Sequence, residues 1–236
     1  MLTNSMYFQS QENLRAAQEA FGSHPDLTIL LRDFRSLDRA QAAFPSNEII
    51  YCPDIALGCP IKLPVTSSKV DVLVLRRNDR GGDHWVLPTG VTAVVQDWEL
   101  THGQDRIKRA YWFSDRVGRK VQSLAGPMAR LRPLTYTGVS KLCVNQALRI
   151  LSQGRVLVTD RMHAAVMGAM LGMPTVAVDL AYDRVSKGQT FGALHEQKIS
   201  AAYECWMGDF PNVVLACNTA EVEDLATGLL RQLTST

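Results

Sequence analysis

Short runs of apolar, often β-branched residues recur along the chain and are separated by polar or charged segments. Runs of this kind are typical of strands that are buried on both faces of a parallel sheet. Apolar residues at helical spacing lie between several of these runs, so strands and helices alternate along the sequence. We predict strands at 27–31, within 47–56, and at 70–75, 156–158, 175–178 and 213–216.

The predicted helices fill the segments between these strands. The last of them, at 219–233, carries Val222, Leu225 and Leu229 on one face, which is the pattern of a helix that packs on a sheet. The alternating order predicts an α/β fold, here a Rossmann-like parallel sheet with flanking helices. The other predicted helices lie at 12–20, 36–43, 101–124, 140–153 and 193–206.

The segment 154–179 has the most clearly bounded strand–helix–strand pattern in the chain. Asp160 is a favourable helix N-cap, Gly172 stands where helices commonly end in a left-handed residue, and Pro174 prevents continuation. We therefore predict a helix that begins directly after one buried strand and ends just before the next.

This arrangement places Arg161, Met162 and His163 at the first three positions of that helix, beyond the carboxyl end of a strand. Ligands of open α/β sheets bind at this end, and a helix amino terminus adds unpaired N–H groups and partial positive charge. Arg161 and His163 there predict an anion site with a titratable proton donor beside it. Spacing alone leaves open a second interpretation, in which both side chains are only structural or solvated.

Length and composition indicate a globular protein. The 236 residues, 46% of them apolar, are enough to bury a substantial core. The net charge of +2 gives no support for a nucleic-acid-binding protein. Neither a membrane-spanning run nor a signal-peptide pattern is present, so we expect a cytoplasmic protein. Five scattered cysteines without a CxxC pair predict reduced thiols and no metal site.

Charged turns follow other predicted strands as well. Arg32 and Asp33 come directly after the first strand, and Ser36 is expected to cap the next helix. This turn is either part of a binding site or an ordinary surface turn. Asp54 follows the second strand, where it either orients a ligand or a nearby arginine or simply ends the strand.

Two further loops are candidates for anion binding. Arg76, Arg77 and Arg80 follow the third predicted strand, and clustered arginines suit a phosphate or carboxylate through forked, charge-assisted bonds. Lys187 lies in a polar loop after Asp179 and is expected over the same crevice as Arg161. All of these cations could equally be solvated.

Basic residues outnumber acidic residues between Asp105 and Arg132, in a segment with helical spacing of its apolar positions. Such a stripe is either a solvated helix face or a surface with weak attraction for anionic lipid or a charged acceptor. Peripheral contact with the inner face of the cell membrane is therefore one expectation.

The run VLVTDRMHAAVMGAMLGMPTVAVD resembles the signature of the polysaccharide pyruvyl transferase family, in which a strand leads into an Asp-Arg-x-His turn, a helix of small residues and a proline. Five other motifs of that family are present along the chain in the order in which the family has them, so the resemblance covers nearly the whole chain. They are found here at Arg32, Asp33 and Ser36, at Pro53, Asp54 and Ala56, at Arg77 and Asp79, at Asp97 and Trp98, and at Asp183 and Lys187.

The resemblance implies both a fold and a reaction. The fold would be the second half of a two-domain, GT-B-like glycosyltransferase architecture. Members of the family transfer the enolpyruvyl group of phosphoenolpyruvate onto a hexose of an exopolysaccharide or its lipid-linked precursor and form a pyruvate ketal. Phosphoenolpyruvate is the donor substrate, so no cofactor and no metal are implied.

The resemblance also implies roles for individual residues. His163 would be the general acid that protonates the methylene carbon, because its ordinary pKa of about 6.5 suits proton transfer near neutral pH. Arg161 would hold the phosphate or carboxylate and stabilise charge as phosphate leaves. The remaining substrate-binding candidates are Arg32, Asp33, Ser36, Arg77, Asp79, Asp160 and Lys187.

The family pattern normally includes a whole domain before the segment at 6–10. We therefore expect residues 1–64 to be a remnant of the first domain and the interdomain region, and residues 65–236 to form the Rossmann-like domain with the Asp-Arg-x-His site. Two alternatives remain open at this stage: a GT-B-type glycosyltransferase, and an inactive half-enzyme that only binds an anionic ligand or a partner. The sequence makes no prediction of the oligomeric state.

Overall fold

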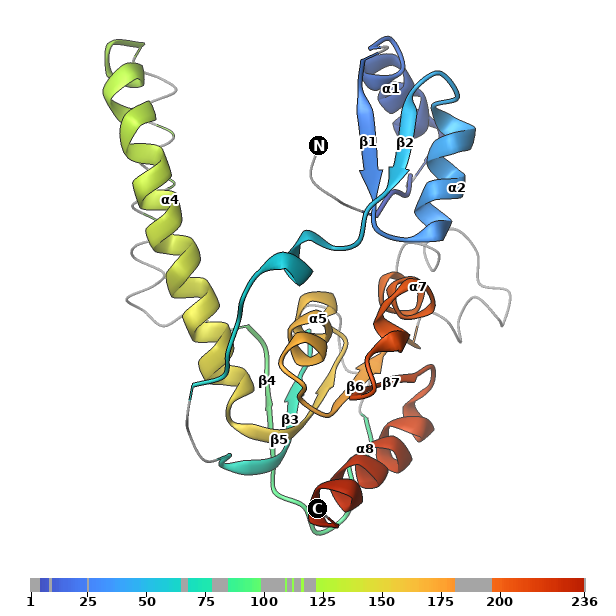
Figure 1. Ribbon diagram of the computed structural model, residues 1–236, viewed down its shortest axis with the longest axis vertical. Coiled ribbons are helices and arrows are strands. Elements are labelled where there is room, and N and C mark those ends of the chain that lie inside the picture. The colour runs from blue at the N-terminus through green and yellow to red at the C-terminus, as the bar shows by residue number, and fades with distance from the viewer. Residues whose placement is uncertain are drawn as a thin grey trace.

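The computed structural model describes residues 5–8, 10–24, 26–64, 68–77, 85–98, 109, 112, 116, 122–180 and 197–235, without the side chains of 122–136. Within these residues, two parallel sheets are flanked by helices (Figure 1). The α/β fold with a Rossmann-like parallel sheet, as predicted from the alternating pattern, is confirmed.

The larger sheet has five parallel strands in the order β4-β3-β5-β6-β7. The chain moves from β3 to β4 on one side and then crosses to β5 on the other, so the strand order reverses between β3 and β5. In doubly wound sheets, ligands bind beyond the carboxyl ends of the strands at such a reversal. The strands are β3 (Val70–Leu75), β4 (Ala93–Gln96), β5 (Gly154–Thr159), β6 (Thr175–Val178) and β7 (Val213–Ala216).

Helices cover both faces of this sheet. Val72 and Val74 of β3 pack in the cluster that includes α8 (Thr219–Thr234), whereas Leu73 and Leu75 pack against α4 and α5. This alternation is what a strand buried on both faces requires. The second face is covered by the end of α4 (Gln122–Leu151), by α5 (Met162–Met170) and by α7 (Lys198–Cys205).

Two glycines fix how α5 lies on the sheet. A Cβ atom on Gly168 would come within 2.3 Å of Thr175 Oγ1, so the helix approaches β6 as closely as glycine permits. Gly172 has φ +67°, the left-handed conformation that ends the helix, as its position in the sequence predicted.

The smaller sheet pairs β1 (Thr28–Leu31) and β2 (Glu48–Tyr51) in parallel, and α2 (Phe34–Ala43) connects them. Ile29, Leu31 and Phe44 lie in its core, and α1 (Gln11–Phe21) precedes it. Figure 1 shows the carboxyl ends of β1 and β2 directed toward α5 and α7 of the larger unit.

The start of α2 differs from the prediction. Asp33 is the N-cap, because its extended backbone precedes Phe34 and its carboxylate accepts a hydrogen bond from the amide of Ser36 at 2.7 Å. Ser36 therefore lies inside the first turn, and its hydroxyl donates to Asp33 at 2.9 Å.

A second difference concerns α4. Ser140, predicted to cap a helix at 140–153, lies in the middle of one continuous helix, where it cannot act as a cap because the preceding residues are already helical. The helix predicted at 101–124 falls mostly outside the described residues, as do residues 193–196 of the helix predicted before Trp206. Among the helices that the structure describes, none combines the length and apolar character needed to cross a membrane.

Candidate functional site at the strand carboxyl ends

The loops after β3 and β5 are joined at the point where the strand order reverses. The backbone amide of Arg77 donates to Asp160 Oδ1 at 3.0 Å. Beneath this contact, Thr159 Oγ1 donates to the carbonyl of Leu75 at 2.6 Å and accepts from the amide of Arg161 at 3.0 Å. These bonds fix the backbone on which Arg161 and His163 are presented.

This arrangement corrects the predicted cap of α5. The N-cap is Arg161, whose backbone is extended, and Met162 and His163 are the first two helical residues. Asp160 is not the cap because its carboxylate is directed across the switch point to the amide of Arg77. Burial raises the pKa of Asp160, and the Arg77 amide and the Arg161 charge act in the opposite direction.

Arg161 is held by an acid from the neighbouring edge of the sheet. Its guanidinium forms an ion pair with Asp97, which follows β4. The other carboxylate oxygen of Asp97 accepts from the amide of Trp98 at 2.7 Å. The Nε atom of Arg161 is buried and has no hydrogen-bond partner among the described residues.

A different set of charges acts on His163. Its side chain keeps solvent exposure, yet surrounding protein atoms withdraw enough water to lower its pKa from 6.5. The negative charge of Asp54 opposes this shift, while the positive charges of Arg32 and Lys198 add to it. One basic and one acidic group from the smaller sheet thus act on a histidine of the larger one.

Arg32 and Asp54 form a buried ion pair, with side chains only 8% and 5% exposed. Arg32 Nε also donates to Ser5 Oγ at 3.0 Å, and the second oxygen of Asp54 accepts from the amide of Ala56 at 3.0 Å. The indole Nε1 of Trp206 donates to the carbonyl of Arg32 at 3.2 Å, so the turn after β1 is tied to the larger unit.

Asp33 and Ser36 have a clear local role. Both are almost fully buried, and they bond to each other and, through Ser36 Oγ, to the backbone of Met6. They also line a small cavity between α2 and α7. Substrate contact by either residue stays a prediction, and Asp79 and Lys187 lie outside the described residues.

Lys198 is a cation near His163 that sequence reasoning did not select. It is the first residue of α7, and its ammonium group donates to Tyr7 OH at 2.9 Å and lies 4.6 Å from the centre of that ring. Because the helix was predicted to begin at residue 193, Lys198 was expected inside the helix and not at its first position. Asp97 and Asp54 could have been selected from the sequence, because both belong to the motifs that carry the family resemblance.

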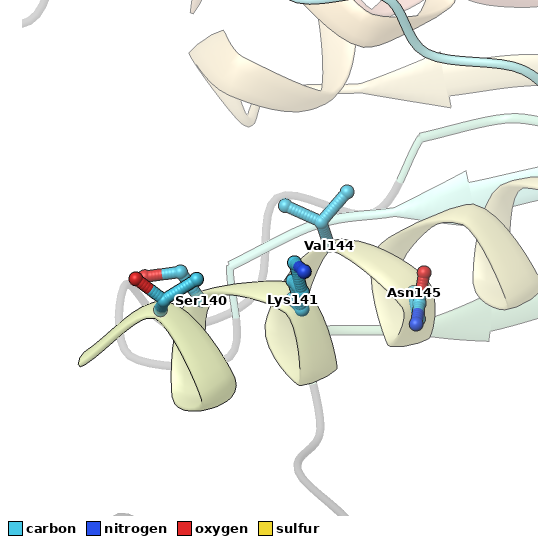
Figure 2. A pocket seen from close by; sticks show the side chains of 5 residues that line it. Ser140, Lys141, Val144 and Asn145 are labelled. Carbon is cyan, nitrogen blue, oxygen red and sulfur yellow. The ribbon is translucent and has the colours of Figure 1, made fainter. Parts of the chain in front are cut away.

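A separate groove lies along α4. Thr137, Ser140, Lys141, Val144 and Asn145 line it, and Figure 2 shows four of these side chains rising from one stretch of the helix. It contains none of the candidate residues. In the part of the chain that the structure describes, no three histidine, cysteine, aspartate or glutamate side chains are grouped to hold a metal ion.

The fold and this site together define an α/β protein with a cationic, histidine-containing site at the switch point of a doubly wound sheet. A sequence model of the family described as polysaccharide pyruvyl transferase matches residues 5–182. The chain belongs to this family.

Two relatives agree with this assignment. The chain is 25% identical over 226 residues to the provisionally named pyruvyl transferase EpsO of Bacillus subtilis (strain 168), covering 95% of this chain and 64% of that protein. It is 24% identical over 189 residues to pyruvyl transferase 1 of Schizosaccharomyces pombe, covering 74% of this chain and 41% of the relative. The chain thus spans less than two thirds of the length of each.

Proposed function

We propose that this chain carries the donor site of a pyruvyl transferase that uses phosphoenolpyruvate. The observation that supports it most directly is the placement of Arg161 and His163 at the start of α5, at the switch point of the sheet, in a chain that matches the family model. A helix amino end with an arginine suits an anionic substrate, and a histidine with access to solvent suits proton transfer.

The proposed reaction joins the central carbon of phosphoenolpyruvate to two hydroxyl groups of a hexose. A proton from the His163 imidazolium adds to the methylene carbon, which becomes the methyl group, and a sugar hydroxyl attacks the adjacent carbon. The bond from that carbon to the phosphate oxygen then breaks, and a second hydroxyl closes the ketal. One of the two hydroxyl protons restores the His163 imidazolium, and the other is taken up by the departing phosphate.

Arg161 would neutralise the departing phosphate or the carboxylate during these steps. The positive charge of Arg32, which follows β1 of the smaller sheet, acts on His163, and Arg32 would bind the second anionic group of the donor. Arg77 would act beside them through its position after β3. No cofactor is needed, because phosphoenolpyruvate itself supplies the leaving group.

Phosphate release from phosphoenolpyruvate in the presence of lipid-linked glycans tests this proposal. His163→Ala should abolish release, and Arg161→Ala should weaken phosphoenolpyruvate binding in calorimetry. His24→Ala and Arg155→Ala are matched controls, since His24 lies in the turn after α1 and Arg155 pairs with Asp71 at the opposite end of β5. Phosphate release that is unchanged in His163→Ala would exclude the general-acid role of His163. If the unchanged chain binds phosphoenolpyruvate but releases no phosphate, the alternative of a chain that only binds an anion is supported.

We further propose that the acceptor is a lipid-linked precursor at the inner face of the membrane. Arg109, Trp112 and Arg116 are exposed, and their spacing of three and four residues is that of one helix face. Tryptophan and arginine together favour the surface of an anionic bilayer. The fraction of the protein that sediments with phosphatidylglycerol vesicles should fall when both arginines are changed to glutamate. An unchanged fraction would contradict contact with the bilayer.

A further inference from the structure

Asp54 joins the two sheets at the candidate site. It follows β2, and one of its carboxylate oxygens pairs with the guanidinium of Arg32, which follows β1. The other oxygen accepts from the amide of Ala56 and thereby caps the short helix η1 (Ile55–Gly58). Both acceptor atoms of this buried acid are therefore in use.

The capped helix η1 packs on the larger unit. Ala56 and Leu57 contact the apolar cluster formed by α5, α7 and Trp206, and η1 lies directly against α5. Asp54 is thus bound on one side to the turn that carries Arg32 and on the other to the segment that rests on the helix of His163. A change in its position would move Arg32 and His163 relative to each other.

We propose that Asp54 is a positioning residue that holds Arg32 and His163 on the same side of the donor site. The part of this inference that concerns catalysis rests on the proposed function. The contacts of Asp54 with Arg32 and Ala56 do not depend on it. Asp54 does not touch the substrate; it fixes the guanidinium beside the imidazole, so that an anion bound by Arg32 lies next to the proton on His163.

The charge of Asp54 adds a second effect. Among the described residues, the charged groups that act on His163 are Asp54 after β2, Arg32 after β1 and Lys198 on α7. Asp54 is the one acid among them, and it raises the pKa of His163 against the effects of burial and of the two cations. The protonated imidazole is the form that a general acid requires.

The test is the titration of the His163 ring in the full chain, followed by NMR and assigned with His163→Gln. In Asp54→Asn the midpoint of His163 should move to lower pH. Asp71→Asn is the matched control, since Asp71 pairs with Arg155 and accepts from Thr92 at the other end of the sheet. An unchanged midpoint in folded Asp54→Asn would overturn the proposal.

A second variant keeps the proposal testable if Asp54→Asn does not fold. Arg32→Gln/Asp54→Asn leaves no buried charge unpaired, and such a double replacement is better tolerated than removal of one partner. Because Asp54 acts on His163 more strongly than Arg32, the midpoint should again move to lower pH. Both titrations are independent of turnover, so absent phosphate release would contradict the proposed reaction without deciding the role of Asp54.

Where release is measurable, the alkaline limb of the kcat profile should move with the NMR midpoint in Asp54→Asn. KM for phosphoenolpyruvate should also rise, because Arg32 loses the contact that orients it. A structural role alone would lower the amount of folded protein and leave the pH profile in place.

Discussion

His163 combines solvent access with an environment that disfavours its charged form. Loss of water around the ring lowers its pKa below 6.5, and Asp54 only partly offsets this. A general acid acts in its protonated form, so activity must be lost as the pH rises through that lowered pKa.

The first prediction is therefore a rate profile that declines with rising pH. The kcat/KM for phosphate release should fall along a limb with a midpoint below 6.5, and release should be negligible at every pH in His163→Gln. Steady-state assays between pH 5 and 8 measure this. A rate that rises through the same range would show that His163 acts as a base instead.

The Arg32–Asp54 pair also matters for stability, since both side chains are almost excluded from water. Removing one partner of a buried ion pair leaves the other charge desolvated and unpaired. Arg32→Ala should therefore lower the free energy of unfolding by about 3–5 kcal/mol, measured by urea denaturation.

Glu204→Gln is the control for this second prediction, because Glu204 and Arg35 are 47% and 31% exposed. Exposed pairs contribute only about 0–1 kcal/mol. Equal losses in the two variants would contradict the importance of burial.

At the scale of elements, α5 is the helix on which the site depends. Its small residues let it lie directly on β5 and β6, which places its first turn beyond their carboxyl ends. Gly168 is the closest point of this contact, with no room for a side chain before Thr175 Oγ1 and Leu157 Cδ2.

The third prediction follows from this packing. Gly168→Ala should destabilise the protein by about 1–3 kcal/mol, because the helix must shift to admit the methyl group. Gly228→Ala on α8 is the matched helical control, since a Cβ there has open space. It should stabilise by about 0.5–1 kcal/mol through better helix propensity. Thermal unfolding distinguishes the two, and stabilisation of both would refute the close contact.

At the scale of the whole molecule, polar contacts between the two sheets frame the site. Arg35 binds Glu204 through two bonds of 2.6 and 2.8 Å, and Trp206 donates to the carbonyl of Arg32. Within the described residues the smaller sheet has two strands, and a two-stranded sheet offers little stability alone. Its order therefore depends on contacts with the larger unit, among them the buried bond from Trp206 to the carbonyl of Arg32.

The fourth prediction concerns Trp206→Phe, which keeps most of the ring and removes the donor to Arg32. Loss of this bond should cost about 0.5–1.5 kcal/mol. Amide exchange should increase in β1 and β2, while β5 and β6 keep their protection. Uniform exchange changes across both sheets would indicate that the two units unfold together.

Local sequence patterns are sufficient to predict the α/β class, the bounds of β3, β6 and β7, and the left-handed end of α5 at Gly172. These features depend on periodicity and local backbone preference, which act over a few neighbouring residues. The motif order also identified the family and drew attention to Arg161 and His163.

The pairing of the charged residues depends on the folded arrangement of the chain. Asp160 looked like a helix cap by local rules, but its carboxylate reaches the amide of Arg77 on another loop. Asp97 holds Arg161 from β4, and Asp54 binds Arg32 beside His163. Such pairs join residues far apart in the chain, and their partners are set by strand order and by the contact between the two sheets, which no local pattern encodes.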